Sequence, residues 1–260
     1  MFDRPIDLGQ ARILLTNDDG LEAQGLKLLE KVVRTLSTDV WVVAPELEQS
    51  GASHSLTLHR PLRVRKAGPQ RFAVDGTPTD CVLLAVNRLL ADKRPTLVLS
   101  GINAGANLGD DVTYSGTVAA AMEATLLDVP AIALSMVFSD RDAIHWPTAE
   151  RHAPEVILRL VAQPWPKNTL INVNFPDRSA EEVAGIAVTR QGRHKIGDQL
   201  MERTDPRGRP YYWIGPLREK DPGIPGTDLA AITEGKIALT PILLDLTNDE
   251  ALAPLRKVFP

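Results

Sequence analysis

The chain has 260 residues, a formal net charge of -4 at pH 7 and 43% hydrophobic residues. This length suits one large α/β domain, and the hydrophobic content supports a sizeable core. The small negative charge excludes a general affinity for nucleic acid polymers or anionic membranes. Cys81 is the only cysteine, which excludes an intrachain disulfide. No stretch is apolar for the length of a membrane span, and the first residues lack the apolar core of a signal peptide, so we expect a cytoplasmic protein.

The first half of the sequence alternates short apolar runs with segments of helical periodicity. Strands are expected at residues 12–16, 40–43, 97–100 and 131–135, and helices at residues 26–36, 78–90 and 117–127. This alternation predicts an α/β fold with a Rossmann-like, mostly parallel sheet that carries helices on both faces. Between the second strand and the second helix, residues 56–74 show short alternating runs, which predict an antiparallel insertion.

The second half is less regular. A helix is expected at residues 149–160 and a strand at residues 170–174, followed by strand-like runs at residues 186–188, 211–214 and 237–239. Residues 205–226 are dense in Pro, Gly and charge and are expected to form β-hairpin excursions that reach away from the sheet. We therefore expect residues 1–140 to form the Rossmann-like core with the site. Residues 141–260 would add the remaining core elements and hairpins, within one domain overall.

The segment with the clearest chemistry follows the first expected strand. The apolar residues 13–15 lead into Asn17, Asp18, Asp19 and Gly20. Adjacent strand residues point to opposite faces, so the two carboxylates can converge only where the strand has ended, and Gly20 permits that turn. Open α/β sheets bind ligands at the carboxyl ends of their strands, and a divalent cation would resolve the repulsion between the two acids. A solvated Asp-Gly turn without chemistry is the alternative.

A second strand-to-helix segment lies at residues 97–124. Its strand breaks into a long loop rich in Gly, Asn and Asp, which leads to Ser115, Gly116 and Thr117 at the first turn of the expected helix. Free backbone N–H groups and the positive end of the helix dipole make such a turn an anion site. Capping by Ser115 alone is the alternative, although a long loop without structure of its own is usually functional.

Several motifs occur in a fixed order along the chain. They are TNDDG at residues 16–20, VAP at 43–45 followed by SGAS at 50–53, GTPTDC at 76–81, SGINAG at 100–105 and YSGTV at 114–118. Shorter matches continue with VTR at 188–190, DPRG at 205–208, YWIG at 212–215 and GTD at 226–228. Together these motifs resemble the SurE family of metal-dependent nucleotidases, and an ordered set is far more specific than any single motif.

The resemblance implies a metal site formed by Asp18, Asp19, Ser50 and Asn103. Two carboxylates, a hydroxyl and an amide carbonyl are oxygen donors, which suit one divalent cation, Mg²⁺ or Mn²⁺, with waters completing the shell. Each of the four follows an expected strand, so they can converge at one edge of the sheet. Ser50 depends on the resemblance, because a serine in a polar loop is more often a turn former.

The expected chemistry is attack by a metal-activated water on a phosphoryl group. The resemblance and the helix start together assign the phosphate to a set of polar groups near the metal. The expected phosphate-binding residues are Asn103, Asn107, Ser115, Gly116 and Thr117. Asp18 and Asp19 are the expected catalytic residues, and either could act as the general base.

The sequence therefore predicts a phosphatase that hydrolyses nucleoside 5'- and 3'-monophosphates, with short polyphosphate as a further substrate. The resemblance also implies a homodimer or homotetramer. The main alternative is a non-catalytic nucleotide-binding regulator, which would not need the paired acids. A haloacid-dehalogenase-type phosphatase needs Asp-x-Asp, whereas Asn17 precedes two adjacent acids here. A metal-dependent glycosyltransferase is a third option, and the lack of Gly-Lys-Ser/Thr excludes a P-loop enzyme.

Other polar and aromatic residues have simpler expected roles. His54 is close to Ser50 in the sequence, but a lone histidine in a loop is usually a surface residue. Thr77, Pro78 and Asp80 form the pattern of a capped helix start, so Asp80 is expected to cap and not to catalyse. Solvated or packing roles are expected for Arg190, His194, Tyr212 and Trp213.

Overall fold

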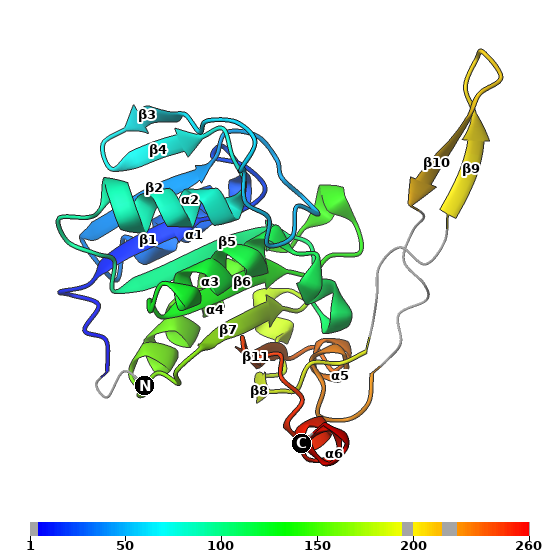
Figure 1. Ribbon diagram of the computed structural model, residues 1–260. Coiled ribbons are helices and arrows are strands. Elements are labelled where there is room, and N and C mark those ends of the chain that lie inside the picture. The colour runs from blue at the N-terminus through cyan, green and yellow to red at the C-terminus, as the bar shows by residue number, and fades with distance from the viewer. Residues whose placement is uncertain (1–4, 194–199, 215–222, 260) are drawn as a thin grey trace.

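The computed structural model describes residues 5–193, 200–214 and 223–259, and its centre is a nine-stranded sheet in the order β3-β4-β2-β1-β5-β6-β7-β11-β8 (Figure 1). The strands are β1 (Arg12–Thr16), β2 (Asp39–Pro45), β3 (Val64–Gly68), β4 (Arg71–Val74), β5 (Leu97–Ala104), β6 (Ala131–Met136), β7 (Thr169–Phe175), β8 (Ile186–Val188) and β11 (Ile237–Leu243). Only the β3–β4 and β7–β11 pairs of this sheet are antiparallel. The predicted mostly parallel α/β sheet is confirmed.

Helices cover both faces of the sheet. They are α1 (Gln24–Val33), α2 (Pro78–Leu84), α3 (Gly116–Leu126), α4 (Trp146–Val161) and α5 (Asp228–Thr233). A last helix, α6 (Asp249–Val258), has no buried residue. Ile13 and Leu15 of β1 pack in one cluster with α1 and α4, whereas Leu14 packs in another with α2 and α3. The alternation of side chains along a strand thus sends neighbouring residues of β1 into opposite core layers. Buried strands of this kind read as continuous apolar runs, which is why the sequence located them.

The strand order creates the edge at which a ligand can bind. From β1 the chain builds outward through β2 and β4, and it then returns to the other side of β1 to add β5, β6 and β7. The direction of the strand order therefore reverses between β1 and β5. In open α/β sheets the crevice at such a reversal, outside the carboxyl ends of the strands, is the usual ligand site.

Several elements differ from the sequence predictions in their bounds or type. Strand β5 does not end at Ser100 but runs to Ala104, because β6 continues to pair with it after a register shift between Ser100 and Asn103. The helix expected at residues 78–90 is α2 followed by a π-helical turn, Ala85–Leu89. The long loop before α3 contains a 3-10 turn, Gly109–Thr113, so it does have structure of its own.

The second half contains elements that the sequence patterns did not reveal. Helices α5 and α6 were not predicted, and strand β11 is longer than expected. A hairpin is present as β9 (Leu200–Thr204) paired with β10 (Pro210–Ile214), and Figure 1 draws it apart from the main sheet. It begins before the region expected to form hairpins, residues 205–226, and residues 215–222 of that region lie outside the described residues. The predicted antiparallel insertion is also present, as β3 and β4. Among the described residues, no helix combines the length and apolar character needed to cross a membrane.

Candidate active site

The two adjacent carboxylates follow β1 at the carboxyl edge of the sheet. The strand ends at Thr16, and Gly20 adopts a φ of 98°, a left-handed conformation that glycine takes at little cost. The side-chain amide of Asn17 donates to the carbonyl oxygen of Gly20 at 2.9 Å and closes this turn. The predicted turn is therefore confirmed, and it lies at the reversal between β1 and β5.

Asp18 is a buried carboxylate. Its Oδ1 accepts a short hydrogen bond from the Oγ1 of Thr117, and its backbone oxygen accepts from the N–H of Gln49 at 2.7 Å. Burial raises the pKa of Asp18 to about 6, and the hydrogen bond from Thr117 opposes the rise while the charge of Asp19 adds to it. Among the described residues, no Lys, Arg or His forms an ion pair with Asp18. Within the described part of the chain, Asp18 is thus a buried acid without a cationic partner.

Asp19 is half-buried and points toward β5. Its Oδ2 accepts from the N–H of Ala104 at 3.0 Å, which joins the end of β5 to the turn after β1. Burial raises the pKa of Asp19, the hydrogen bond from Ala104 lowers it, the charge of Glu48 raises it and that of Arg141 lowers it. Neither Glu48 nor Arg141 was singled out from the sequence, because their approach to Asp19 depends on how separate loops fold.

Ser50 and Asn103 lie on the segments that border the two carboxylates. The hydroxyl of exposed Ser50 donates to Oε1 of Glu48 at 2.8 Å, and Glu48 is the residue whose charge acts on Asp19. The Nδ2 of Asn103 donates to the carbonyl of Gly105 at 3.0 Å. No described residue donates to the Oδ1 of Asn103. Asn103 belongs to β5, so the expectation that every proposed ligand follows a strand is wrong for this residue.

The start of α3 lies directly against Asp18. Ser115 is the N-cap, and its Oγ accepts from the N–H of Val118 at 3.0 Å. A Cβ added to Gly116 would lie 2.7 Å from the Cβ of Asp18, so only glycine allows this approach. Thr117 bonds to Asp18 from the same turn. The N–H of Gly116 precedes the first intrahelical bond of α3 and remains available as a donor, whereas the backbone N–H of Thr117 also bonds to Asp18.

Asn107 belongs to a buried polar network instead of an open loop. Its Nδ2 donates to the Oγ of Ser135 at 2.8 Å, and its N–H donates to the Oδ1 of Asn174 at 2.9 Å. Its carbonyl oxygen accepts from the side-chain amides of Asn172 and Asn174. The loop before α3 is thereby anchored to β6 and β7, and the packing of this network gives Asn107 a structural function in its own right.

The remaining residues named from the sequence have other partners. His54 pairs through Nε2 with Oε2 of Glu123 at 3.0 Å. Asp80 forms the predicted capping box with Thr77, and it also accepts from the N–H of Thr57 at 3.0 Å. Tyr212 and Trp213 are exposed on β10, and Arg190 forms an isolated bridge with Thr227. His194 lies outside the described residues.

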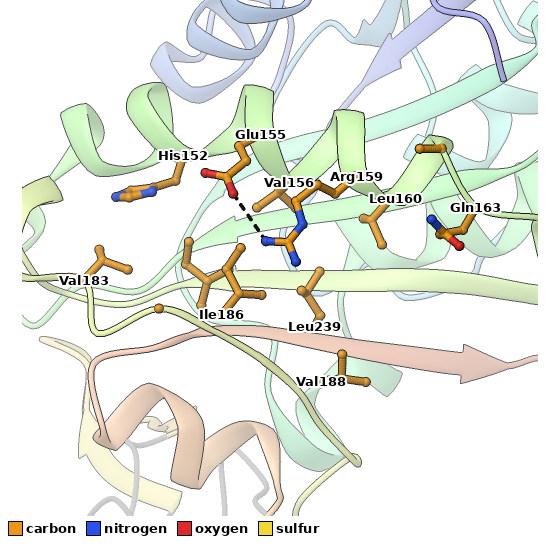
Figure 2. A pocket seen from close by; sticks show the side chains of 13 residues that line it. His152, Glu155, Val156, Arg159, Leu160, Gln163, Val183, Ile186, Val188 and Leu239 are labelled. Carbon is orange, nitrogen blue, oxygen red and sulfur yellow. Dashed lines mark hydrogen bonds and ion pairs between the residues drawn. The ribbon is translucent and has the colours of Figure 1, made fainter. Parts of the chain in front are cut away.

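Two cavities differ in their relation to this site. A cavity of about 280 Å³ adjoins the carboxylates; Asp19, Glu48 and Ala104 form part of its wall. A larger one of about 710 Å³ lies between α4 and strands β8 and β11 (Figure 2). The larger cavity is lined mainly by apolar side chains, and its polar lining includes the ion pair of Arg159 with Glu155 at 3.3 Å. None of the predicted site residues lines it, whereas Asp19 lines the smaller cavity.

Comparisons with known proteins agree with this arrangement. The family model described as Survival protein SurE matches residues 13–198. The chain is 59% identical to the 5'-nucleotidase SurE of Paramagnetospirillum magneticum, covering 99% of both chains, and 56% identical to that of Rhodospirillum rubrum, covering 100% of both. The crystal structure of SurE protein from Aquifex aeolicus superposes with a TM-score of 0.84 at 39% identity, covering 95% of this chain and 99% of that one. The chain belongs to the SurE family.

Proposed function

We propose that this protein is a metal-dependent nucleotidase that hydrolyses nucleoside 5'- and 3'-monophosphates to nucleoside and phosphate. The observation that carries the proposal is the Asp18–Asp19 pair at the reversal of strand order, where the buried acid has no cationic partner among the described residues. The relatives named 5'-nucleotidase SurE supply the substrate class. Short polyphosphate, which offers the same phosphoryl chemistry, is included as a further substrate.

The residues at this edge fit one divalent cation, Mg²⁺ or Mn²⁺. Asp18, Asp19, Ser50 and Asn103 offer only oxygen donors, the atoms that hard cations prefer. A cation would also offset the cost of burying Asp18 beside a second carboxylate, which its raised pKa reflects.

The groups around Asp18 would have different roles in hydrolysis. When bound, the cation would lower the pKa of a water molecule and neutralise charge on the phosphoryl group. The N–H of Gly116, at the positive end of α3, would donate to a phosphoryl oxygen, and the helix dipole would stabilise the charge that develops there. Oδ1 of Asp19 has no hydrogen-bond donor among the described residues, whereas the carboxylate of Asp18 accepts from both the hydroxyl and the backbone N–H of Thr117. The lone pairs that these two carboxylates keep would hold the cation and accept a proton from the attacking water.

Phosphate release from adenosine 5'-monophosphate tests this proposal. We expect turnover that EDTA abolishes and that added Mg²⁺ or Mn²⁺ restores. Asp19→Asn should lose most of the turnover, whereas Asp92→Asn should not, because Asp92 is 74% exposed and pairs with Arg12 at the start of β1. Turnover that survives exhaustive chelation contradicts the metal-dependent mechanism. Metal-dependent binding of the nucleotide without turnover would instead support the regulatory alternative.

The exposed hairpin supports the further proposal of a homodimer or homotetramer. Leu200, Tyr212, Trp213 and Ile214 leave large apolar surfaces exposed on β9 and β10. A lone two-stranded hairpin is marginally stable in water and gains stability by packing on another surface. Light scattering after size exclusion should give a mass of two or four chains. A monomeric mass at micromolar concentration would contradict this assignment.

A further inference from the structure

The cavity beside Asp19 shares this one residue with the proposed metal site. Asp19, Glu48 and Ala104 line the side that faces the carboxylates, and Gln24, Arg141 and Trp146 are among the residues that line the rest of its wall. Its volume is about 280 Å³. Because Asp19 belongs to both, a substrate whose phosphoryl group lies at the metal site has its remaining part directed to this cavity or to solvent.

Arg141 is held at the rim by contacts distant from the cavity. It lies in a 3-10 turn, Arg141–Ala143, between β6 and α4. Asp177, which follows β7, accepts from the N–H of Ser139 at 2.9 Å and pairs with the Nδ1 of His145 at 3.2 Å. The carboxylate of Asp177 thus binds the segment on both sides of Arg141. These contacts fix the backbone position of this arginine.

The guanidinium group of Arg141 is not paired with another side chain of the described residues. Its charge acts on Asp19, but no described residue forms a hydrogen bond or ion pair with it. Arg71, by contrast, pairs with Glu30. Arg141 therefore presents donors to the cavity that a bound molecule can use.

An indole ring forms another part of the wall. Trp146, at the start of α4, is half-buried and reaches the first turn of α1. A Cβ added to Gly25 would lie 3.0 Å from Cη2 of Trp146 and 1.8 Å from the carbonyl oxygen of Ile102. Glycine at position 25 thus lets α1, β5 and the indole meet closely. The exposed part of the ring offers a flat apolar surface beside polar groups.

The composition of the wall distinguishes between possible occupants. Glu48 and Asp19 place two carboxylates against the single positive charge of Arg141, which disfavours a second anionic group. The same set suits an uncharged group that has a flat ring, hydroxyl donors and ring acceptors. Glu48 can accept from sugar hydroxyls, Arg141 can donate to ring nitrogens or carbonyls, and Trp146 can stack on the base. A nucleoside has all of these features.

We propose that the cavity lined by Arg141, Trp146 and Glu48 is the nucleoside subsite, and that Arg141 and Trp146 determine the preference for nucleotides over simpler phosphate esters. The proposal rests on the nucleotidase function proposed above and assigns to these residues a function that differs from that of the carboxylates. The carboxylates and the start of α3 serve every phosphate ester, whereas the subsite serves only those that carry a base.

The test compares substrates that differ only in what the phosphate carries. We would measure kcat/KM for adenosine 5'-monophosphate, β-glycerol phosphate and tripolyphosphate with wild-type protein, Arg141→Gln and Trp146→Leu. For both variants the loss on the nucleotide should exceed the loss on β-glycerol phosphate by about tenfold, mainly through KM. Arg151→Gln is the matched control, since Arg151 is an exposed arginine of α4 that does not line the cavity. Thermal melting verifies that the leucine variant is folded.

Other outcomes overturn the proposal. Equal losses on adenosine 5'-monophosphate and β-glycerol phosphate would mean that Arg141 acts only through its charge on Asp19. A loss that is greatest on tripolyphosphate would assign the cavity to a second phosphate. Equilibrium dialysis with adenosine, which has no phosphate, separates this proposal from the nucleotidase proposal. Saturable binding that is about tenfold weaker in Arg141→Gln supports the subsite even in an inactive protein, and its absence in the wild type refutes the subsite even in an active one.

Discussion

Gly116 and Asp18, which are far apart in the sequence, are in direct contact. A Cβ at Gly116 would lie 2.7 Å from the Cβ and 2.9 Å from the Oδ2 of Asp18. The sequence assigned Gly116 to phosphate approach at a helix start, and the structure gives this glycine a second function, because its missing side chain makes room for the buried acid. The first turn of α3 therefore positions Asp18 through both Gly116 and Thr117.

Gly116→Ala should reduce both turnover and stability. The helix gains about 1 kcal/mol from alanine, but forcing a Cβ against Asp18 costs about 1–3 kcal/mol and displaces the carboxylate. A displaced catalytic group can lower kcat about a hundredfold. Steady-state kinetics and thermal melting check this, with Gly68→Ala as control because its added Cβ makes only an ordinary contact at 3.7 Å. A more stable enzyme with unchanged kinetics would show that the turn is only a helix cap.

Asp18→Asn should abolish activity while stabilising the metal-free protein. The native acid is buried next to Asp19 with no cationic partner among the described residues, and its pKa is raised to about 6 by burial. At pH 8 the folded protein must therefore carry a charge whose burial costs about 3 kcal/mol, and asparagine removes this cost. Melting at pH 8 in EDTA should give a higher Tm than that of the wild type. A lower Tm would mean that other groups in the folded protein already stabilise the charge of Asp18.

Ser50→Ala should weaken metal affinity more than it weakens the fold. Ser50 is exposed, and its hydroxyl bonds only to Glu48 among the described residues, so little packing is lost. We expect Mn²⁺ affinity to fall about tenfold while the metal-free Tm is unchanged. Ser55→Ala, another exposed serine of the same loop region, is the control. If the metal titrations of variant and wild type superpose, Ser50 does not bind the metal and only forms a turn.

Asp39→Asn should change the pH dependence of stability without affecting turnover. Burial would raise the pKa of Asp39, but its hydrogen bonds with Arg12, Trp41 and Lys93 outweigh this and lower the pKa. A carboxylate with a lowered pKa stabilises the fold above its unfolded pKa and loses this effect as the pH falls through its folded pKa. The variant should therefore be less stable by about 1 kcal/mol at pH 7.

The measurement for Asp39 is Tm against pH for both proteins. The difference in Tm should be constant around neutral pH and should close below about pH 4, where the wild-type carboxyl becomes protonated. Phosphate release should stay the same, because Asp39 begins β2 at the edge of the sheet opposite to the site. A Tm difference that persists in acid would mean that the side-chain amide disturbs packing and that the charge matters little.

The sequence by itself determined the central strands and the turn that carries the two acids. The apolar run before Asp18 predicts a buried strand because its residues pack on both faces of a parallel sheet, and the acids with Gly20 predict the turn that follows. The capping box at Asp80 and the N-cap at Ser115 were also predictable, since caps are local and depend on residues three positions apart.

Only the tertiary structure decided which distant segments complete the site. Strand β5 continues through Gly101 and Asn103, poor strand formers, because β6 pairs with it, and no local pattern signals that pairing. Asn107 joins a network with residues of β6 and β7, and Arg141 reaches Asp19 from a turn fastened by Asp177. Local periodicity depends on a residue and its sequence neighbours, so it can predict helices and strands. It cannot predict the charges and contacts around Asp18 and Asp19, because these arise between segments that meet only after the sheet has formed.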